Sequence, residues 1–281
     1  MSKKLIADSG STKTDWILLE DGKISDSFKT KGLNPFFISK NDFLKEIREK
    51  ILPVIKGEVD EIFFYGAGVT DNIEANKIKE PLSQLFFKAK IEVQNDQLGA
   101  SRALFGNQAG IVCTLGTGSN SCLYDGRKIQ IAIPPLGFIL GDEGSGNALG
   151  KRLIGDYFKR IMPVEIRILF EEEYKITIGQ VLNNVYKTSN SSKYLAGFAP
   201  FLSKNIADPY CQQILKKNTV DFFERNVLTI PSAKKYPIGF VGSIAYYFKD
   251  FIIRRACEYG FNKYRIEKKP IDGLINFHKN N

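Results

Sequence analysis

The sequence has few of the residues from which metal centres and disulfide frameworks are built. Its four cysteines, at positions 113, 122, 211 and 257, form no Cys-x-x-Cys pair, and its single histidine, His278, lies close to the end of the chain. This pattern argues against a zinc site, a disulfide framework and histidine catalysis, and it favours a reducing compartment. We therefore expect a cytoplasmic protein.

Long apolar segments are also absent. The longest run, Ile131–Leu140, contains two prolines and is far shorter than the ~18–20 residues that cross a bilayer. Near the first residue only Leu5–Ala7 is apolar, which is too short for the core of a signal peptide. The sequence thus predicts no membrane partner.

Two common nucleotide-binding signatures are missing as well. No segment matches G-x-x-x-x-G-K-[ST], the signature of a P-loop. No G-x-G-x-x-G opens a helix after the first expected strand, which disfavours a Rossmann domain. A nucleotide, if one is bound, must be held in another way.

The composition is that of a globular protein with a basic excess. The chain has 281 residues, 43% hydrophobic and 25% charged, which is enough for one large or two ordinary domains. The formal net charge is +9, and residues 201–281 hold 14 basic and 7 acidic residues. These bases occur as scattered pairs at helical spacing among aromatic residues, so we interpret them as solvated helix faces and expect no nucleic-acid partner.

One arrangement of strands and turns occurs twice. Residues 4–30 alternate apolar runs with turns and predict a β-meander that turns at Asp21-Gly22. Residues 110–124 repeat this arrangement and turn at Asp125-Gly126. Helical periodicity follows each meander, and residues 150–228 are mainly helical. The sequence predicts one more strand at Tyr236–Val241 and a helix over 244–258. The sequence predicts a duplicated α/β domain with mixed sheets and a junction at about residues 105–110.

Three glycine-containing turns follow predicted strands. They are Asp8-x-Gly10-x-Thr12, Gly116-Thr117-Gly118 and Gly239-x-x-Gly242-Ser243. Such turns expose several backbone N–H groups in a small concavity that can hold a phosphate. Each of them alone is better explained as a tight structural hairpin, so only the set is informative.

Four segments together resemble one known superfamily. They are Asp8–Thr14, Asn95–Ala100, Gly116–Ser119 and Gly141–Gly146. The chain resembles the actin-like ATPases, and within them the N-acetylglucosamine kinase branch, grouped with BadF/BadG/BcrA/BcrD-type ATPases. The resemblance implies an α/β fold of two RNase-H-like domains with mixed sheets and ATP in an interdomain cleft. We expect domains at residues 1–107 and 108–281, and leave open whether the C-terminal tail docks back on the first.

The resemblance also implies a nucleotide site. ATP and Mg²⁺ would be the cofactors, with Asp8 holding the metal, in part through water. The expected phosphate ligands are Gly10, Ser11, Thr12, Lys13, Gly116, Thr117 and Gly118. Gly242 and Ser243 would bind adenosine at the start of a helix. A solvated lysine in a hairpin is an equally good interpretation of Lys13.

The acceptor site is assigned in the same way. Asp96 is the expected catalytic base, although an aspartate before a helix is also a good N-cap. The resemblance implies sugar contacts by Asn34, Gly66, Ala67, Asp96, Thr117, Asp142 and Glu143. The alternatives are a plain Asn-Pro turn at Asn34 and an acidic turn that caps a helix at Asp142-Glu143.

The expected activity is transfer of the ATP γ-phosphate to the 6-hydroxyl of N-acetylglucosamine or a closely related amino sugar. Pro135-Leu136-Gly137 stands where the family usually has Gly-Trp-Gly, and Ser9 where many members have glycine. The first departure leaves glucosamine or N-acetylmuramate open as acceptors. An ATPase that activates a partner protein is the other alternative, although scattered cysteines argue against an iron–sulfur cluster. A homodimer stays open.

Overall fold

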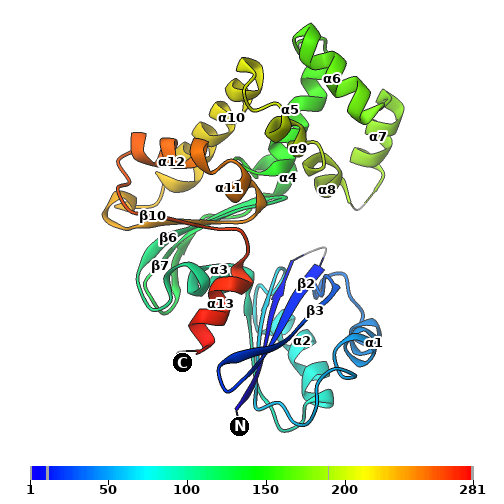
Figure 1. Cartoon of the computed structure of the whole chain (residues 1–281), viewed down its shortest axis with the longest axis vertical. Helices are drawn as coiled ribbons and strands as arrows, with labels where there is room; N and C mark the ends of the chain where they lie inside the picture. Colours follow the sequence, from blue (N-terminus) through cyan, green and yellow to red (C-terminus); the bar gives the residue numbers. More distant parts are fainter. Residues whose placement is uncertain (1, 11–12, 189, 280–281) are drawn as a thin grey trace. The chain divides into compact units, whose positions relative to one another are not determined.

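The computed structural model describes residues 2–10, 13–188 and 190–279. The described chain forms two compact units. Unit 1 consists of the residues up to Gln108, the turn Asp125–Lys128 and the residues from Lys269 onward; unit 2 consists of Ala109–Tyr124 and Ile129–Lys268. Figure 1 shows the elements of both units.

Unit 1 is built on a five-stranded mixed sheet in the order β3-β2-β1-β4-β5. The first three strands are antiparallel, as the predicted meander requires, and β4 and β5 run parallel to β1. The strands are β1 (Lys3–Ser9), β2 (Lys13–Glu20), β3 (Lys23–Lys31), β4 (Glu61–Gly66) and β5 (Lys90–Asn95). The helices are α1 (Lys40–Lys50), α2 (Asn72–Leu85), α3 (Asp96–Phe105) and α13 (Pro270–Lys279).

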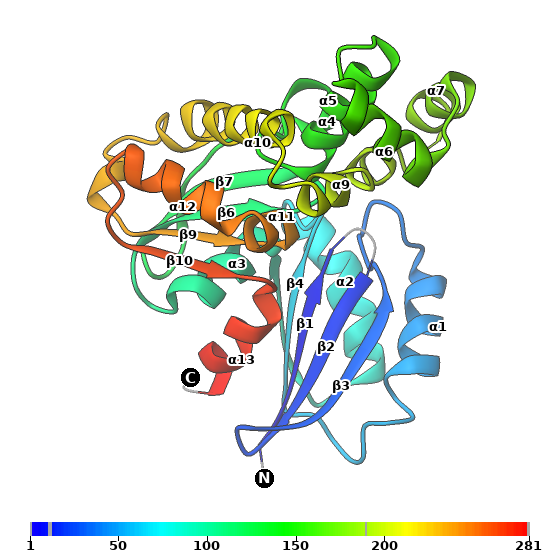
Figure 2. The same cartoon turned by 45° about the horizontal axis from the view of Figure 1, so that its top comes forward.

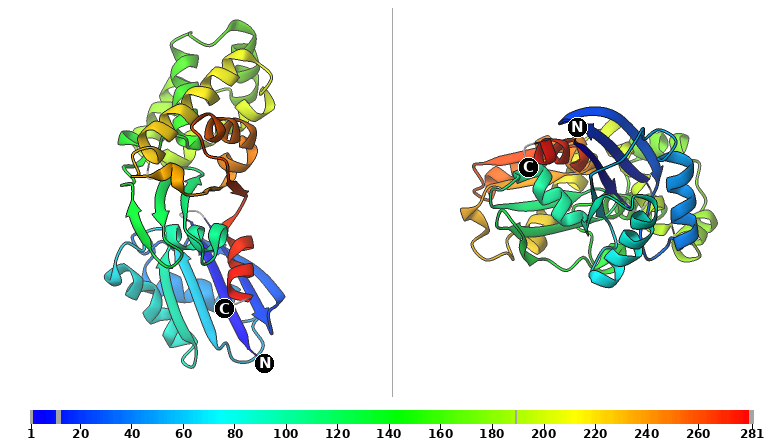
Figure 3. Two further views of the ribbon diagram at one scale, coloured as in Figure 1. Left: turned by 90° about the vertical axis from the view of Figure 1, so that its left-hand side faces the viewer. Right: turned by 90° about the horizontal axis from the view of Figure 1, so that it is seen from below.

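Both faces of this sheet are covered by helices. Alternation along β1 sends Leu5 and Ala7 into a core with residues of α1 and α2, whereas Ile6 joins Leu274 and Ile275 of α13 on the opposite face. Figures 2 and 3 show α13 against this second face. Burial on both faces explains why β1 is a continuous apolar run and not an alternating one.

Unit 2 repeats the topology of unit 1. Its sheet has the order β10-β9-β6-β7-β8, with antiparallel β6, β7 and β8 and with β9 and β10 parallel to β6. These strands are β6 (Gly110–Leu115), β7 (Ser119–Tyr124), β8 (Ile129–Ala132), β9 (Ile238–Val241) and β10 (Tyr264–Glu267). The predicted α/β duplication with mixed sheets is therefore confirmed.

A helical insertion separates β8 from β9. It contains α4 (Gly137–Leu140), α5 (Gly146–Phe158), α6 (Val164–Tyr174), α7 (Ile178–Tyr186), α8 (Ser191–Ala196), α9 (Ala199–Lys204) and α10 (Pro209–Phe222), then the π-helix η1 (Phe223–Val227) and the 3₁₀-helix η2 (Ala233–Lys235). The helix predicted over 244–258 is divided at Phe248 into α11 (Ser243–Tyr247) and α12 (Lys249–Glu258). Within the described residues, no helix is both long and apolar enough to cross a membrane.

Candidate active site

The carboxyl ends of β1, β4 and β5 meet at one edge of the unit 1 sheet. Ser9 is opposite Gly66, and Gly66 is opposite Asn95 in the parallel registers. Asp8 and Asp96, one residue from these positions, therefore come from the ends of β1 and β5, the two strands that flank β4. Ligands of open α/β sheets bind at such an edge.

Asp8 lies among other carboxylates. It pairs with Asp15 in the β1–β2 register. Burial is the largest cause that raises the pKa of Asp8 to about 7, and the negative charges of Asp96 and Asp15 raise it further. A cation bound near Asp8, Asp15 and Asp96 would reduce the repulsion between their negative charges.

Two lysines offset part of this negative charge. Lys13 Nζ lies 3.1 Å from Asp15 Oδ2, and Lys269 Nζ lies 3.5 Å from the same oxygen. Both ammonium groups lower the pKa of Asp8, although less than burial raises it. Lys13 is therefore half-exposed and forms an ion pair with Asp15. Lys269, which was not predicted from the sequence, pairs with the same carboxylate.

Asp96 opens helix α3 without acting as its cap. The N-cap is Asn95, whose side-chain Oδ1 accepts a hydrogen bond from Leu98 N at 2.7 Å. Desolvation raises the pKa of Asp96, and the backbone N–H groups of Gln97 and of Asp96 itself lower it. Solvent nevertheless reaches this side chain. The capping alternative is taken by Asn95, so the Asp96 carboxylate remains available to a ligand.

Strands β1 and β2 stay paired up to the residues that flank their turn. Gly10 N donates to Lys13 O at 3.0 Å, and the hydroxyls of Ser9 and Thr14 lie 2.8 Å apart. Two of the predicted phosphate ligands, Ser11 and Thr12, lie outside the described residues.

Asn34 and the Gly66-Ala67 segment lie around Ser9. Ser9 O accepts from Ala67 N at 2.8 Å, and Ser9 Oγ accepts from Leu33 N at 3.1 Å. Asn34 is buried, and its Oδ1 accepts from Phe36 N at 2.9 Å, which is the turn that the alternative interpretation expected. The structure therefore brings Asn34, Gly66 and Ala67 together in unit 1.

In unit 2 the Gly116-Thr117-Gly118 turn is bonded to the start of α5. Gly116 O accepts from Gly146 N at 2.8 Å, and Thr117 O accepts from Asn147 N at 3.0 Å. A Cβ on Gly118 would lie 2.9 Å from Asp142 Oδ1, so a side chain at this position would displace the Asp142 carboxylate. The turn and the Gly141–Gly146 segment therefore form one structure.

Asp142 holds that structure together. Its Oδ1 accepts from Ser119 N at 3.1 Å and its Oδ2 accepts from Asn147 Nδ2 at 2.7 Å. The backbone of Asp142 has φ of +60°, which is uncommon for a non-glycine residue and marks a constrained position. Asp142 is thus fixed before any ligand binds.

Gly242 and Ser243 lie beside the same turn. Gly242 has φ of +120°, and a Cβ there would collide with the Leu115 carbonyl directly before Gly116. Gly242 N donates to Glu267 O at 3.2 Å, and Ser243 begins α11. Four predicted nucleotide contacts of unit 2 therefore occur close together: Gly116, Thr117, Gly118 and Gly242.

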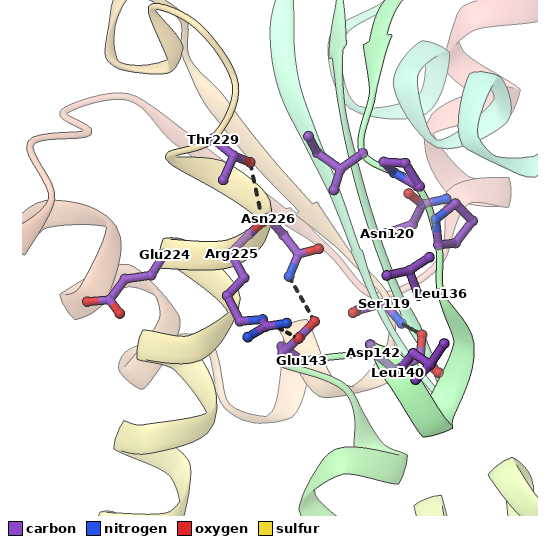
Figure 4. Close-up of a pocket in the computed structure, with 14 residues that line it drawn as sticks. Ser119, Asn120, Leu136, Leu140, Asp142, Glu143, Glu224, Arg225, Asn226 and Thr229 are labelled. Carbon is purple, nitrogen blue, oxygen red and sulfur yellow. Dashed lines mark hydrogen bonds and ion pairs between the residues drawn. The ribbon is translucent and has the colours of Figure 1, made fainter.

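Glu143 is engaged by two residues that the sequence interpretation missed. Arg225 Nε lies 2.5 Å from Glu143 Oε1, and Asn226 Nδ2 donates to Glu143 Oε2 at 3.2 Å. Both partners come from the π-helix η1, as Figure 4 shows. No sequence signal could have found them, because a π-helix has no periodic signature that separates it from the preceding helix.

The donor set fits a magnesium–nucleotide complex. Among the described residues, no group of three or more His, Cys, Asp or Glu side chains could hold a metal ion unaided. Mg²⁺ in phosphoryl-transfer sites takes only one or two carboxylates and completes its shell with phosphates and water. Asp8, crowded by other carboxylates, meets that requirement.

The sequence matches no protein-family model and no curated protein. Among solved structures it is similar to a Porphyromonas gingivalis protein named as an inferred N-acetylglucosamine kinase. The two are 39% identical, the similarity covers 100% of this chain and 99% of that one, and the TM-score is 0.93.

Two more distant structures share the fold. A Chromobacterium violaceum protein, also named as an inferred N-acetylglucosamine kinase, is 17% identical with a TM-score of 0.69, and 99% of each chain is covered. A ROK family glucokinase from Streptomyces griseus, solved with glucose and AMPPNP, is 16% identical with a TM-score of 0.59 and 98% coverage of each chain.

Proposed function

We propose that this chain, which belongs to the N-acetylglucosamine kinase branch of the actin-like ATPase superfamily, phosphorylates the 6-hydroxyl of N-acetylglucosamine or a closely related amino sugar. The chain is a sugar kinase, a phosphotransferase with an alcohol group as acceptor, and it uses ATP. The amino-sugar acceptor and the 6-hydroxyl are the proposed part. A cytoplasmic location, a homodimer and a role in amino-sugar metabolism stay predictions.

The observation that carries the proposal is the position of Asp96. Its carboxylate begins α3 at the end of β5, exposed to solvent, while Asn95 supplies the cap. Protein surroundings raise its pKa, which makes it a better proton acceptor than an ordinary aspartate. We assign Asp96 as the base that takes the proton of the attacking hydroxyl.

Asp8 is the proposed metal-holding residue. It would hold Mg²⁺ with water molecules between, and the bound ion would neutralise charge on the transferred phosphoryl group. Burial and the negative charges of Asp96 and Asp15 disfavour the charged form of the Asp8 carboxylate. A divalent cation therefore gains affinity from relief of this repulsion.

We assign phosphate binding to the backbone N–H groups of both glycine turns, and a charge-neutralising role to Lys13. In unit 2, Asp142 keeps the Gly116–Gly118 turn in place through Ser119 N. Gly242 and Ser243 are the proposed adenosine contacts. The proposed sugar contacts are Asn34, Gly66, Ala67, Asp96, Thr117, Asp142 and Glu143.

The test is a coupled assay of ADP release with Mg-ATP. N-acetylglucosamine, glucosamine, N-acetylmannosamine, N-acetylmuramate, glucose and no sugar would be compared for the wild type and Asp96→Asn. Loss of a general base lowers kcat by about 10²–10⁴-fold. Asp71→Asn is the matched control, because Asp71 caps α2 in the same unit and asparagine caps equally well.

The proposal predicts sugar-dependent ADP release that Asp96→Asn abolishes and Asp71→Asn preserves. ADP release that is the same with every sugar, and the same in Asp96→Asn, would contradict it. That result would favour the alternative of an ATPase that activates a partner protein. No observation favours that second function, since Cys113, Cys122 and Cys211 are buried thiols.

A further inference from the structure

A cavity within unit 2 has two unlike walls. Its volume is about 460 Å³. One wall is apolar and comes from the segment before α4, with Pro134, Pro135 and Leu136; the opposite wall is polar and comes from η1, with Arg225 and Asn226. Figure 4 shows Leu136 on one side of the cavity and Arg225 and Asn226 on the other, with Glu143 between them.

The polar wall is held rigidly. The Asn226 carbonyl accepts from Ser121 Oγ of β7 at 2.7 Å, and the ring of Phe223, at the start of η1, is fully buried and stacked on Tyr259. Arg225 and Asn226 of this π-helix both contact Glu143. π-helical turns are rare and occur frequently at functional sites.

Arg225 keeps hydrogen-bonding capacity for a ligand. Its side chain is 63% exposed, and its described ion pair uses the Nε edge of the guanidinium. A guanidinium has five N–H donors in a planar fork, so further donors remain for a carbonyl oxygen. Because Glu143 already balances the positive charge, Arg225 acts as a donor without attracting a free anion.

The charge of the cavity argues against an acidic acceptor. Asp142 accepts from neutral donors only, Ser119 N and Asn147 Nδ2, so its negative charge is not balanced by a described ion pair. A sugar that carries a carboxylate would be repelled by it. A neutral group with a carbonyl on one side and a methyl on the other suits the polar and apolar walls together.

We infer that Arg225 is a specificity-determining residue that recognises the acetamido carbonyl of the acceptor sugar, with Glu143 and Asn226 holding it in position. The inference rests on the proposed function, because it takes the cavity as the place of the amino-sugar substituent. It assigns to Arg225 and this cavity the discrimination of an N-acetylated amino sugar from a deacetylated or carboxylated one.

The experiment measures binding apart from catalysis. Isothermal titration calorimetry with N-acetylglucosamine and with glucosamine would be run on the wild type, Arg225→Met and the double variant Arg225→Met/Glu143→Gln. The double variant leaves no unpaired carboxylate behind. Arg152→Met is the matched control, since half-exposed Arg152 pairs with the buried Asp156 of the same helix, α5, at 2.8 Å and does not line the cavity.

We expect both Arg225 variants to weaken N-acetylglucosamine binding by about 10-fold or more, as for loss of a hydrogen bond from a charged donor. Glucosamine binding should change by less than about threefold, within the effect of a surface charge. Arg152→Met should change neither. In the kinase assay the same variants should raise KM for N-acetylglucosamine with little change in kcat.

Equal weakening for the two sugars, or no weakening for N-acetylglucosamine, would overturn the inference. So would a wild-type protein that does not bind N-acetylglucosamine. The proposed function fails differently: N-acetylglucosamine binds and depends on Arg225, yet ADP release does not depend on sugar. The two failures are therefore distinguishable.

Discussion

At the scale of single residues, the clustered carboxylates of unit 1 lower the stability of the folded protein and suit the binding of a cation. Asp8 and Asp15 are directly opposite on neighbouring strands, and like charges in that relation are destabilising. Lys13 and Lys269 reduce the repulsion through Asp15, yet the pKa of Asp8 is still raised to about 7. An acidic site that is unfavourable when empty is a property expected of a cation-binding centre.

The pH dependence follows from this raised pKa. An aspartate in the unfolded chain titrates near its model value of 3.8, whereas folded Asp8 titrates near 7. Between these values the folded state binds more protons, so Asp8 lowers stability as pH rises from about 4 to about 7, and the loss is complete above that. The maximum contribution is about 4 kcal/mol, and it is an upper bound because the carboxylate is partly accessible to solvent.

Asp8→Asn should therefore stabilise the metal-free protein while abolishing kinase activity. Its advantage over the wild type in urea unfolding should be about 1–3 kcal/mol larger at pH 8 than at pH 5. Mg²⁺ with nucleotide should stabilise the wild type and not the variant. If the free energies of unfolding of the two proteins changed in parallel across this pH range, the charged Asp8 carboxylate would not destabilise the folded state, and the prediction would be wrong.

Individual contacts divide into those that sequence can predict and those that it cannot. Asp8 and Asp96 occur within short segments that resemble a family, so their importance is visible in the sequence. Lys269 and Arg225 are not visible, because each meets its carboxylate only through folding: Lys269 is far from Asp15 along the chain, and Arg225 is far from Glu143.

At the scale of elements, α3 and α13 pack with their backbones in close contact. A Cβ on Gly273 of α13 would collide with the backbone of Ala103 in α3. Tyr65 of β4 links both helices: its hydroxyl accepts from Arg102 Nη1 at 2.6 Å and lies 2.9 Å from His278 Nε2. Because α3 begins at Asp96, α13 supports the helix that carries the proposed base.

The single histidine belongs to this packing. Burial lowers the pKa of His278 to about 3, with smaller contributions from the positive charges of Arg102 and Lys4. The ring is therefore neutral at physiological pH, and it stacks on Phe63 with centroids 3.9 Å apart. Its structural role agrees with the sequence interpretation, which gave it no part in catalysis.

Gly273→Ala tests the close helix contact. The added methyl group meets backbone atoms that cannot rotate away, so we expect a destabilisation of about 2–3 kcal/mol in urea unfolding and a lower kcat. Gly155→Ala in α5 is the control, because nothing lies within 4 Å of its Cβ. Alanine there should stabilise by up to about 1 kcal/mol. Equal effects of the two substitutions would contradict the close packing of α3 and α13.

Elements differed in how far the sequence revealed them. Buried apolar runs such as Leu5–Ala7 and Ile111–Cys113 predicted the central strands correctly, since burial leaves a continuous hydrophobic signal. Strand β10 was missed because it is short and mostly exposed at a sheet edge. The break at Phe248 was missed because apolar spacing continues through it.

At the scale of the whole molecule, the two units have the same strand topology, but the chain is not divided between them at a single point. Helix α13 follows β10 as α3 follows β5, yet its apolar residues join the core of unit 1. Unit 1 is thus assembled from segments far apart in the sequence. From the sequence we expected all of residues 108–281 in a second domain, and the docking of the tail was left open. An apolar pattern shows that a helix packs against a core, but it does not indicate which core.

Fragments of the chain test this assembly. Residues 1–108 alone should form a loosely packed state, whereas residues 1–108 joined by a flexible linker to 269–281 should unfold cooperatively. The three side chains that α13 buries, Ile271, Leu274 and Ile275, contribute about 1.5–3 kcal/mol each. Near-ultraviolet circular dichroism and urea unfolding would measure the difference, with Leu274→Asp in the linked fragment as the control. Equal cooperativity in all three fragments would contradict the account.

We propose that the protein transfers a phosphoryl group to the 6-hydroxyl of an amino sugar, with Asp96 as the base. The most direct measurement is proton-coupled ³¹P NMR of a reaction of Mg-ATP with N-acetylglucosamine. We predict ADP together with a phosphomonoester signal split into a triplet by the two protons of the 6-methylene group, with neither formed by Asp96→Asn. ATP consumed to ADP and inorganic phosphate alone, at the same rate in both proteins, would contradict the claim.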